Sequence, residues 1–355
     1  MEHSQLKDQK VVIIGGGLSG LVLAYELLKK NVHPLILEAS DRLGGRIQTI
    51  KGLKGTLLEL GATWFSDQHI YLSNLLKELG LKKYAQFSKG KSLFQTKSFE
   101  PPQEFYVPEG DSPSYRIVGG TQMLTDTLIS HITGSEIKVN ANVVSITQIS
   151  NGIIIHLKNG ESVQADKVIV CIPPQLAFQN IDFVPSFPED LAQVLPQVQT
   201  WMAGSIKFAV EYENPFWRLE GYSGMLYSHS GIITEMYDHT NFEETKFGIM
   251  GFLNGGAANY SQDVRKEFVL NHLSDLLGEK AMRPLAYFDK VWNDEYLMAG
   301  TQTIQRPHQN NGHPLLQNSY MDGKLLFANT ETSTQNAGYM EGAIVAATLI
   351  AKKLS

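Results

Sequence analysis

Three glycines near the N-terminus have the spacing of a phosphate-binding turn. An apolar run at 11–14 is followed by Gly15, Gly17 and Gly20 in a G-x-G-x-x-G pattern. The first glycine allows a tight strand-to-helix turn, the second lets the backbone approach a pyrophosphate, and the third lets the helix pack on the strand. Glu38 ends the next apolar run, where a carboxylate can bind ribose hydroxyls. The pattern predicts a dinucleotide site; the alternative is an ordinary turn followed by a chance acid.

A second run of glycine and arginine follows Glu38 directly. It contains Arg42, Gly44, Gly45 and Arg46 in the order D-R-x-G-G-R. The paired glycines allow another close backbone approach, and the planar fork of Arg46 can bind a pyrophosphate. Such an additional clamp suits FAD, which stays bound, better than a nicotinamide cofactor that leaves at each turnover. The alternative is a cluster of surface charges.

Bulk properties exclude several classes of function. The chain has 355 residues, 43% hydrophobic and 19% charged, with a formal net charge of −6 and no basic tract, so nucleic acid is not an expected partner. Cys171 is the single cysteine, which excludes an internal disulfide. We expect neither a signal peptide nor a membrane-spanning segment, and therefore a soluble cytoplasmic protein. His308 and His313 are expected to be loop histidines; the alternative is a metal pair, and no metal is predicted.

The elements that position these motifs follow from hydrophobic periodicity. The pattern predicts a helix over 71–81 and another over 264–278, with Val264, Phe268, Val269, Leu273, Leu276 and Leu277 in the core. The segment 84–116 is expected to be irregular. Alternation predicts three strands within 136–147, 152–160 and 162–174, and further strands at 204–213 and 247–253. The last segment, 324–354, is expected to give a strand, a polar connection and a helix.

That last segment resembles the C-terminal signature of the flavin-containing amine oxidases, the family of monoamine and polyamine oxidases. It reads F-A-N-T-E-T at 327–332 and G-Y-M-E-G-A at 338–343, with Asn329 where the family has glycine. The resemblance includes the two glycine runs, L-G-A-x-W at 60–64, R-I-V-G-G at 116–120, the I-P-P strand end and G-S-I-K…P-F-W at 204–217.

The resemblance implies an α/β fold with a Rossmann-like FAD-binding domain of the GR2 type and an α+β substrate domain. The expected FAD-binding domain is discontinuous (1–70, 117–196 and 300–355), with a short substrate domain formed by 71–116 and 197–299. The C-terminal membrane anchor of the mitochondrial members is not expected. Gly300 stands where monoamine oxidases carry the cysteine that attaches the flavin, so the FAD is expected to be noncovalent. By resemblance, Val143 approaches the adenine, Met340 faces the N1–C2=O edge of the flavin, and Thr330 and Glu331 lie along the ribityl-pyrophosphate chain. The other residues expected to bind FAD are Gly15, Gly17, Leu18, Ser19, Gly20, Glu38, Ala39, Arg42, Gly44, Gly45, Arg46, Gly61, Ala62, Thr63, Trp64, Gly338 and Tyr339.

Four residues are expected to form the reaction site. Lys207 lies between apolar neighbours in a predicted strand; the resemblance implies that it holds a water at flavin N5, and the alternative is a lysine that points to solvent. Tyr339 matches one wall of the aromatic cage that holds the amine, whereas the other wall falls on Thr301. Trp292 matches a tryptophan near the flavin; the alternative is an ordinary core residue.

The predicted function is an FAD-dependent amine oxidase that converts a C–N bond to an imine, with O2 as acceptor and an aldehyde or ketone, ammonia or an amine, and H2O2 as products. The protein would supply orientation and a dry site, and the cofactor the redox chemistry. One alternative is a non-amine flavin oxidase or desaturase of the same fold, similar to protoporphyrinogen oxidase or renalase. Another is a flavin-binding protein without catalysis. The expected partners are a small-molecule amine and O2; the sequence predicts neither the particular amine nor an oligomeric state.

Overall fold

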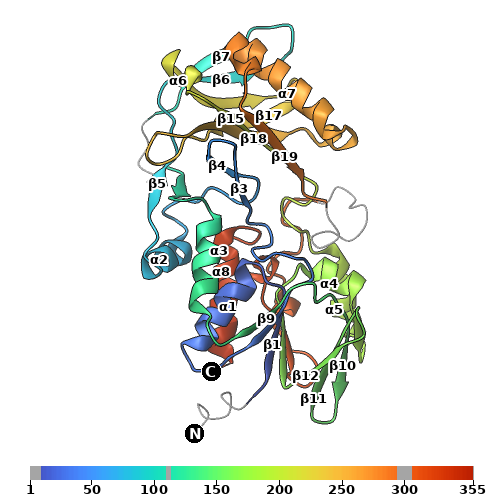
Figure 1. The fold of residues 1–355 in the computed structure, drawn as a ribbon. Coiled ribbons are helices and arrows are strands. Elements are labelled where there is room, and N and C mark those ends of the chain that lie inside the picture. The colour runs from blue at the N-terminus through green and yellow to red at the C-terminus, as the bar shows by residue number, and fades with distance from the viewer. Residues whose placement is uncertain (1–8, 109–112, 294–305, 355) are drawn as a thin grey trace.

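The computed structural model describes residues 9–108, 113–293 and 306–354. Figure 1 shows an elongated molecule with a parallel sheet and its helices at one end and a large mixed sheet, covered by one long helix, at the other. The end with the parallel sheet contains the apolar run at 11–14, the glycine turn that follows it and the C-terminal helix. The predicted α/β architecture with two different sheets is therefore confirmed.

The parallel sheet is built from strands that are apolar on both faces. Val11–Ile14 is completely buried. Its side chains point alternately to the two faces of the sheet, so Ile13 belongs to one hydrophobic cluster and Val12 and Ile14 belong to another. Strands covered on both sides read as continuous apolar runs, as observed here. In spatial order, the strands are β20 (Leu325–Phe327), β13 (Lys167–Val170), β1 (Val11–Ile14), β2 (Leu35–Leu37) and β9 (Glu136–Lys138).

Helices cover one face of this sheet, and α1 packs closely against α8. Leu21 and Leu23 of α1 share a cluster with Ile344 of α8 and with Leu72 of α2, which also packs on α8. The expected domain boundaries stay a prediction, and the packing of α2 favours grouping this helix with the parallel sheet. These helices are α1 (Leu18–Leu28), α2 (Ile70–Glu78), α3 (Gln122–His131) and α8 (Met340–Lys353).

A four-stranded sheet covers the other face. The three strands expected between 136 and 174 are in fact five, because a left-handed residue, Asn140, separates β9 from β10 and a break at Asp166 separates β12 from β13. β9 and β13 join the parallel sheet, and the remaining three form the cover together with a later strand. In spatial order it contains β12 (Ser162–Ala165), β11 (Gly152–Leu157), β10 (Val143–Ile149) and β14 (Asp182–Val184); the short helices α4 (Pro174–Asn180) and α5 (Glu189–Val194) follow β13 and β14.

The mixed sheet has seven strands and includes part of the segment expected to be irregular. β6 and β7 form its outer edge, and β5 (Lys83–Ala85) pairs with β8 (Tyr115–Ile117), so the expectation for 84–116 is wrong. This segment contributes edge strands, which carry little of the alternation that identifies a strand from sequence. In spatial order the strands are β19 (Ala286–Val291), β15 (Ile206–Tyr212), β18 (Phe247–Leu253), β17 (Ile233–Asp238), β16 (Tyr222–Ser228), β6 (Lys91–Gln95) and β7 (Gln103–Tyr106).

The helix expected over 264–278 is confirmed as α7 (Gln262–Leu277), and it covers one face of the mixed sheet. Val269, Leu273, Leu276 and Leu277 are buried. Val264 is only half-buried and Phe268 is 41% exposed, so the assignment of these two residues to the core is wrong. The short helix α6 (Phe216–Leu219) precedes β16.

A hairpin connects the two ends of the molecule. It consists of β3 (Thr49–Lys51) and β4 (Leu57–Glu59), and it lies between the parallel and the mixed sheets in Figure 1. Leu58 of β4 packs with Ala209 and Met250 of the mixed sheet. The turn at 60–64, which follows β4, is thereby brought between the two sheets.

Candidate functional site

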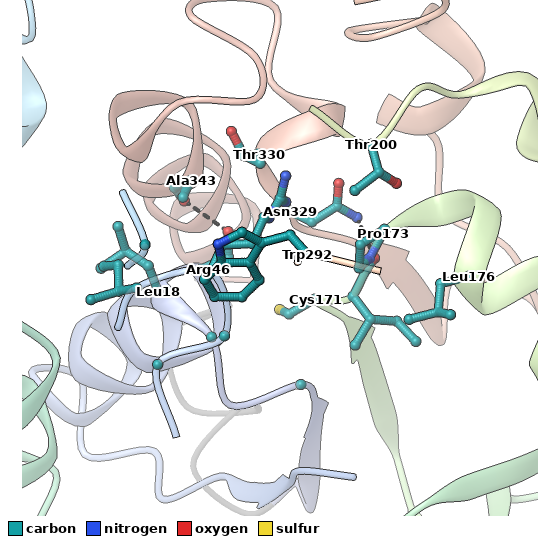
Figure 2. A pocket seen from close by; sticks show the side chains of 18 of the residues that line it. Leu18, Arg46, Cys171, Pro173, Leu176, Thr200, Trp292, Asn329, Thr330 and Ala343 are labelled. Carbon is teal, nitrogen blue, oxygen red and sulfur yellow. Dashed lines mark hydrogen bonds between the residues drawn. The ribbon is translucent and has the colours of Figure 1, made fainter. Parts of the chain in front are cut away.

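A cavity of about 850 Å³ extends from the carboxyl ends of the parallel strands to one face of the mixed sheet. Figure 2 shows its walls, with Leu18, Arg46 and Ala343 on one side, Cys171, Pro173 and Leu176 on the other, and Trp292 between them. Open α/β sheets bind ligands at this edge.

The first glycine turn forms the floor at the parallel-sheet end. Gly15 has a φ of +106°, and a Cβ on Gly20 would lie 2.0 Å from the carbonyl oxygen of Gly15, so α1 can pack this closely only with glycine there. A Cβ on Gly17 would meet only the Cα of Gly45, at 3.8 Å. Gly15 and Gly17 therefore line the cavity, whereas Gly20 acts behind it through packing.

Glu38 lies at the end of β2 and is held by the first glycine turn and by its own loop. Its Oε2 accepts the N–H of Gly16 at 2.7 Å, and its Oε1 accepts the N–H and the hydroxyl of Ser40 at 2.9 and 2.7 Å. The carboxylate lines the cavity with a fixed orientation. A ribose would therefore meet an acceptor that is already positioned.

The two arginines of the second glycine run have different roles. Arg42 donates to backbone carbonyls of its own loop, those of Leu43, Gly45 and Ile47, and so holds the loop together. Arg46 forms a forked ion pair with the fully buried Glu331, at 2.6 and 3.0 Å. Both arginines line the cavity, and Glu331 orients Arg46 from behind.

The C-terminal signature places a helix N-terminus at the cavity. Helix α8 begins at Met340 with Tyr339 as its N-cap, and Gly338, Tyr339 and Met340 line the cavity. Thr330 supports this turn through a 2.7 Å bond to the carbonyl of Tyr339. Free N–H groups at a helix N-terminus favour negative charge, and so does the helix dipole.

Asn329, which departs from the resembling signature, joins two strand ends. Its side chain accepts the N–H of Thr332 at 3.2 Å and donates to the carbonyl of Ile172 at 2.9 Å. It therefore caps the short helical turn Thr330–Thr332 and ties that turn to the end of β13. Glycine could supply neither bond.

Lys207 points into the molecule, so the solvent-facing alternative is wrong. The residue is 3% exposed, and its Nζ donates to the carbonyl of Gly61 and to the hydroxyl of Thr63, each at 2.5 Å. The ammonium lies 4.9 Å from the ring centre of Trp64. Burial lowers the pKa of Lys207 to about 7, although the carboxylate of Glu59 acts in the opposite direction.

The side chain of Trp292 also binds the turn at 60–64. Its Nε1 donates to the carbonyl of Leu60 at 2.7 Å, and the indole is 5% exposed within the cavity wall. The turn at 60–64 thus gathers the side chains of Lys207 and Trp292, and Gly61, Ala62, Thr63 and Trp64 all line the cavity.

The predicted aromatic cage is only partly described. Tyr339 lines the cavity and is 42% exposed, and it packs with His308 and Trp201 at ring-centre distances of 5.8 and 6.0 Å. Thr301, like Gly300, lies outside the described residues. Sequence reasoning missed Trp201, because the ring contacts that join it to Tyr339 cross more than a hundred residues of chain.

Four side chains form a row across the mixed sheet that the sequence did not reveal. Register places Lys290 opposite Lys207, Lys207 opposite Phe252, and Phe252 opposite Glu235. All four line the cavity. Glu235 is the carboxylate at this end among the described lining residues, and it accepts a hydrogen bond from the hydroxyl of Tyr237. Such a row depends on strand pairing, which no local pattern specifies.

The remaining predicted positions also fall at the cavity. Leu18, Ser19, Ala39, Gly44, Gly45 and Val143 line it, at the N-terminus of α1, in the two loops and at the start of β10. In the described parts of the chain, no group of three or more histidine, cysteine or acidic residues could hold a metal ion. Within the same parts, no helix is long and apolar enough to cross a bilayer.

Comparison with protein families follows this geometry. The model of the flavin containing amine oxidoreductases matches residues 18–101 and 94–355, which is most of the chain. The chain belongs to this family. The match begins after Gly15 and Gly17, and it includes the second glycine run, the Lys207 strand and the C-terminal helix.

Curated relatives carry names from this family, and solved structures share the fold. A probable flavin-containing monoamine oxidase A of Dictyostelium discoideum is 26% identical, over 97% of both chains. Amine oxidase B of Sus scrofa is 26% identical over 97% of this chain and 85% of its own. Cyclohexylamine oxidase from Brevibacterium oxydans has the same fold (TM-score 0.85, 20% identity, 98% of both chains), as does putrescine oxidase bound to putrescine (TM-score 0.84, 21% identity, 97% and 98%).

Proposed function

We propose that this protein is an FAD-dependent amine oxidase that uses O2 as its acceptor. The observation that supports this most directly is the buried Lys207 at one end of the cavity, with the glycine turns at the other. In this proposal, the parallel-sheet part binds the cofactor and the mixed sheet forms the substrate side. The family assignment supports flavin chemistry as a class, and the amine and the acceptor belong to the proposal.

Several features of the cavity support FAD as its ligand. Gly15, Gly17, Gly44 and Gly45 offer backbone without side chains, and the N-termini of α1 and α8 both face inward. The hydroxyl of Thr200 lines the cavity, is buried, and has no hydrogen-bond partner among the described residues, so a polar ligand would satisfy it. We assign Glu38 to the ribose, Arg46 to the pyrophosphate and the Met340 end of α8 to the flavin ring.

We further propose that the FAD is not covalently attached. Cys171 does line the cavity, at the end of β13, but burial raises the pKa of its thiol. The protonated thiol is a poor nucleophile. Acid precipitation of the yellow protein should leave the flavin in the supernatant; flavin retained in the pellet would contradict this assignment.

The bound flavin would accept a hydride equivalent from the carbon next to the amine nitrogen and pass two electrons to O2. The resulting imine is then hydrolysed by water. The protein's contribution lies in its residues. Trp64, Phe252 and Trp292 supply apolar surface near the reacting position, and Lys207 holds a protonatable group there whose pKa of about 7 lets it donate or accept a proton near neutrality.

Glu235 supports an amine that carries a second polar or cationic end. It is separated from Lys207 by one strand and by the side chain of Phe252. An amine lying along the row would place its reacting carbon near Lys207 and its far end near the Glu235 carboxylate. A cationic far end would be attracted to the Glu235 carboxylate, and this attraction is stronger where water is excluded from the cavity.

A flavin oxidase or desaturase acting on a non-amine is the alternative, favoured by the packing of Tyr339 against Trp201 and His308 instead of an open cage. An anaerobic screen with monoamines, diamines and non-amine donors separates the two. Bleaching of the flavin by an amine supports the proposal. Bleaching only by non-amine donors supports the alternative, and no bleaching by any donor favours a non-catalytic flavin protein.

A further inference from the structure

A second cavity, of about 500 Å³, lies away from the first. Among its walls are Tyr84, Phe87, Arg116, Arg218, Thr240 and Phe242, and it shares no described lining residue with the first cavity. It is formed by the segment around β5, by β8 and by the turn after β17. Arg116 belongs to the R-I-V-G-G motif, to which the proposed oxidase chemistry gives no role.

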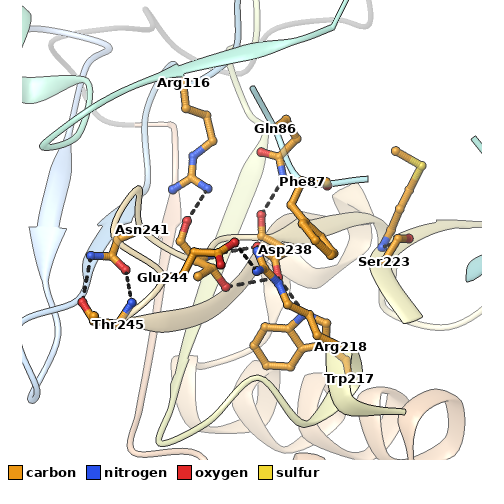
Figure 3. Close-up of polar contacts among 12 residues, drawn as sticks. Gln86, Phe87, Arg116, Trp217, Arg218, Ser223, Asp238, Asn241, Glu244 and Thr245 are labelled. Carbon is orange, nitrogen blue, oxygen red and sulfur yellow. Dashed lines mark hydrogen bonds and ion pairs between the residues drawn. The ribbon is translucent and has the colours of Figure 1, made fainter. Parts of the chain in front are cut away.

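The two arginines of this cavity differ in their pairing (Figure 3). Arg218 donates to both oxygens of Asp238, at 2.7 and 2.8 Å, and to Glu244 at 2.9 Å. Arg116 makes one hydrogen bond, from Nη1 to the carbonyl of Thr240 at 3.0 Å, and forms no ion pair with any carboxylate in the described part of the chain. Asp238 is fully buried and is already used by Arg218, Trp217 and Thr240.

Arg116 is therefore a buried cation with unused donors. It is 6% exposed, and a guanidinium carries five N–H groups in a rigid fork. Burial of a charge is unfavourable unless the charge is paired, and burial lowers the pKa of the Arg116 guanidinium. The cavity beside it has room for a ligand that would pair with the fork.

Aromatic rings supply the rest of the wall. The guanidinium of Arg116 lies 5.0 Å from the ring centre of Tyr84, and Phe242, which is 52% exposed, packs on that same ring at 5.6 Å. Phe87 lies under Arg218, with the guanidinium 3.6 Å from its ring centre. A planar anion with an apolar body matches this combination of a fork and flat rings.

We propose that this second cavity binds a small carboxylate with an aromatic or apolar body, whose carboxylate pairs with Arg116 and whose body lies against Tyr84 and Phe242. The proposal does not depend on the proposed amine oxidation. Lys89 at the rim adds to the positive charge, while Glu244 is occupied by Arg218.

The bonded side chains of Trp64 and Gln86 lie between the first cavity and the second. Gln86 accepts the indole N–H of Trp64 at 2.9 Å and donates to the backbone carbonyl of Asp238 at 2.7 Å. Trp64 lines the first cavity and Gln86 the second. A carboxylate bound at Arg116 leaves the first cavity open, so it should not compete with an amine there.

The test is calorimetric titration of the flavin-loaded protein with benzoate, with benzyl alcohol as its neutral analogue and inorganic phosphate as a non-aromatic anion. We expect benzoate to bind one site without changing the flavin absorption spectrum, and at least tenfold more tightly than the other two probes. Phe242→Glu, which places a negative charge at the rim, should weaken benzoate binding at least tenfold. Tyr260→Glu is the matched control, because Tyr260 is a similarly exposed aromatic (47%) outside the cavity. This variant should bind benzoate as tightly as the parent protein does.

Arg116→Gln should abolish benzoate binding, but it also removes a buried hydrogen bond to Thr240. If the Arg116→Gln protein is unstable, the result for Phe242→Glu decides the test. Three results would each overturn the proposal. One is benzoate affinity that is equal in the Phe242→Glu and Tyr260→Glu proteins. Another is phosphate binding as tightly as benzoate, and the last is a benzoate-induced flavin spectrum with competition against an amine, which would place the ligand in the first cavity.

Discussion

The two ends of the large cavity differ in the groups that form their walls. At the parallel sheet, the walls are mainly backbone: glycine turns and the N-termini of two helices, with Glu38 held by the first glycine turn and by its own loop. At the mixed sheet, the walls are side chains in a row, with the buried cation of Lys207 beside apolar rings. We expect the first end to bind its ligand by close approach and to be sensitive to added volume. The second end depends on desolvation and is sensitive to charge.

The largest expected effect tests the volume-sensitive end. In Gly20→Ala, the new Cβ would lie 2.0 Å from the carbonyl oxygen of Gly15, so α1 must move away from the sheet. We expect a loss of about 3 kcal/mol in the free energy of unfolding, at the upper end of the range for overpacking. Urea unfolding measures it. Gly17→Ala is the matched control, because its Cβ meets only Gly45 Cα at 3.8 Å; it should weaken flavin retention while keeping stability within about 1 kcal/mol of the parent. Equal destabilisation by both changes would contradict this view of the turn.

The charge-sensitive end should show itself in the pH dependence of stability. The folded pKa of Lys207, about 7, is below its ordinary value of 10.5, so the unfolded chain binds more protons between these two pH values. Stability from this group therefore rises with pH in that window, by about 2 kcal/mol between pH 7 and pH 9. Lys207→Met removes the titrating group, so the stability difference between parent and variant should change in favour of the parent as the pH rises. A difference independent of pH would mean that Lys207 stays charged in the folded protein.

Lys207→Met also tests the proposed chemistry. Methionine has similar volume without the charge, so the fold and bound FAD should persist. Reoxidation of the reduced flavin by O2, followed by stopped flow, should slow by about an order of magnitude or more, as expected when one preorganised polar group is lost. Lys290→Met, the neighbour in the same row, is the control and should change this rate less. Unchanged rates of flavin reduction and reoxidation in the Lys207 variant would mean that this lysine only holds the 60–64 turn in place.

The smallest expected effect concerns the far end of the row. Glu235→Gln keeps the hydrogen bond to Tyr237 possible but removes the charge. For a diamine, we expect KM to rise roughly three- to tenfold with little change in kcat, which corresponds to the loss of one partly solvated ion pair. A monoamine should be almost unaffected, and equal changes for both amines would remove Glu235 from substrate recognition.

Sequence reasoning worked best where a function requires particular residues in a short segment. Gly15, Gly17, Glu38 and the start of α8 all line one cavity, because each motif follows from the local geometry of one strand-to-helix connection, and their binding of FAD stays a prediction. It worked less well for strand pairing: the segment with β6 and β7 was expected to be irregular, and three strands were expected between 136 and 174, where the structure has five in two sheets. Pairing partners, not local pattern, decide such cases.

By itself, the sequence determined the α/β class, the cofactor-type turn and the family, because these depend on residue types at short, fixed spacings. Only the tertiary structure decided which way Lys207 points, since alternation in a strand leaves two faces open until the sheet packs. It also brought Glu235 into the row with Lys207 and left Arg116 without a carboxylate partner among the described residues. These contacts join strands that are distant in the chain, and their energies come from burial and cross-strand register, neither of which any single segment encodes.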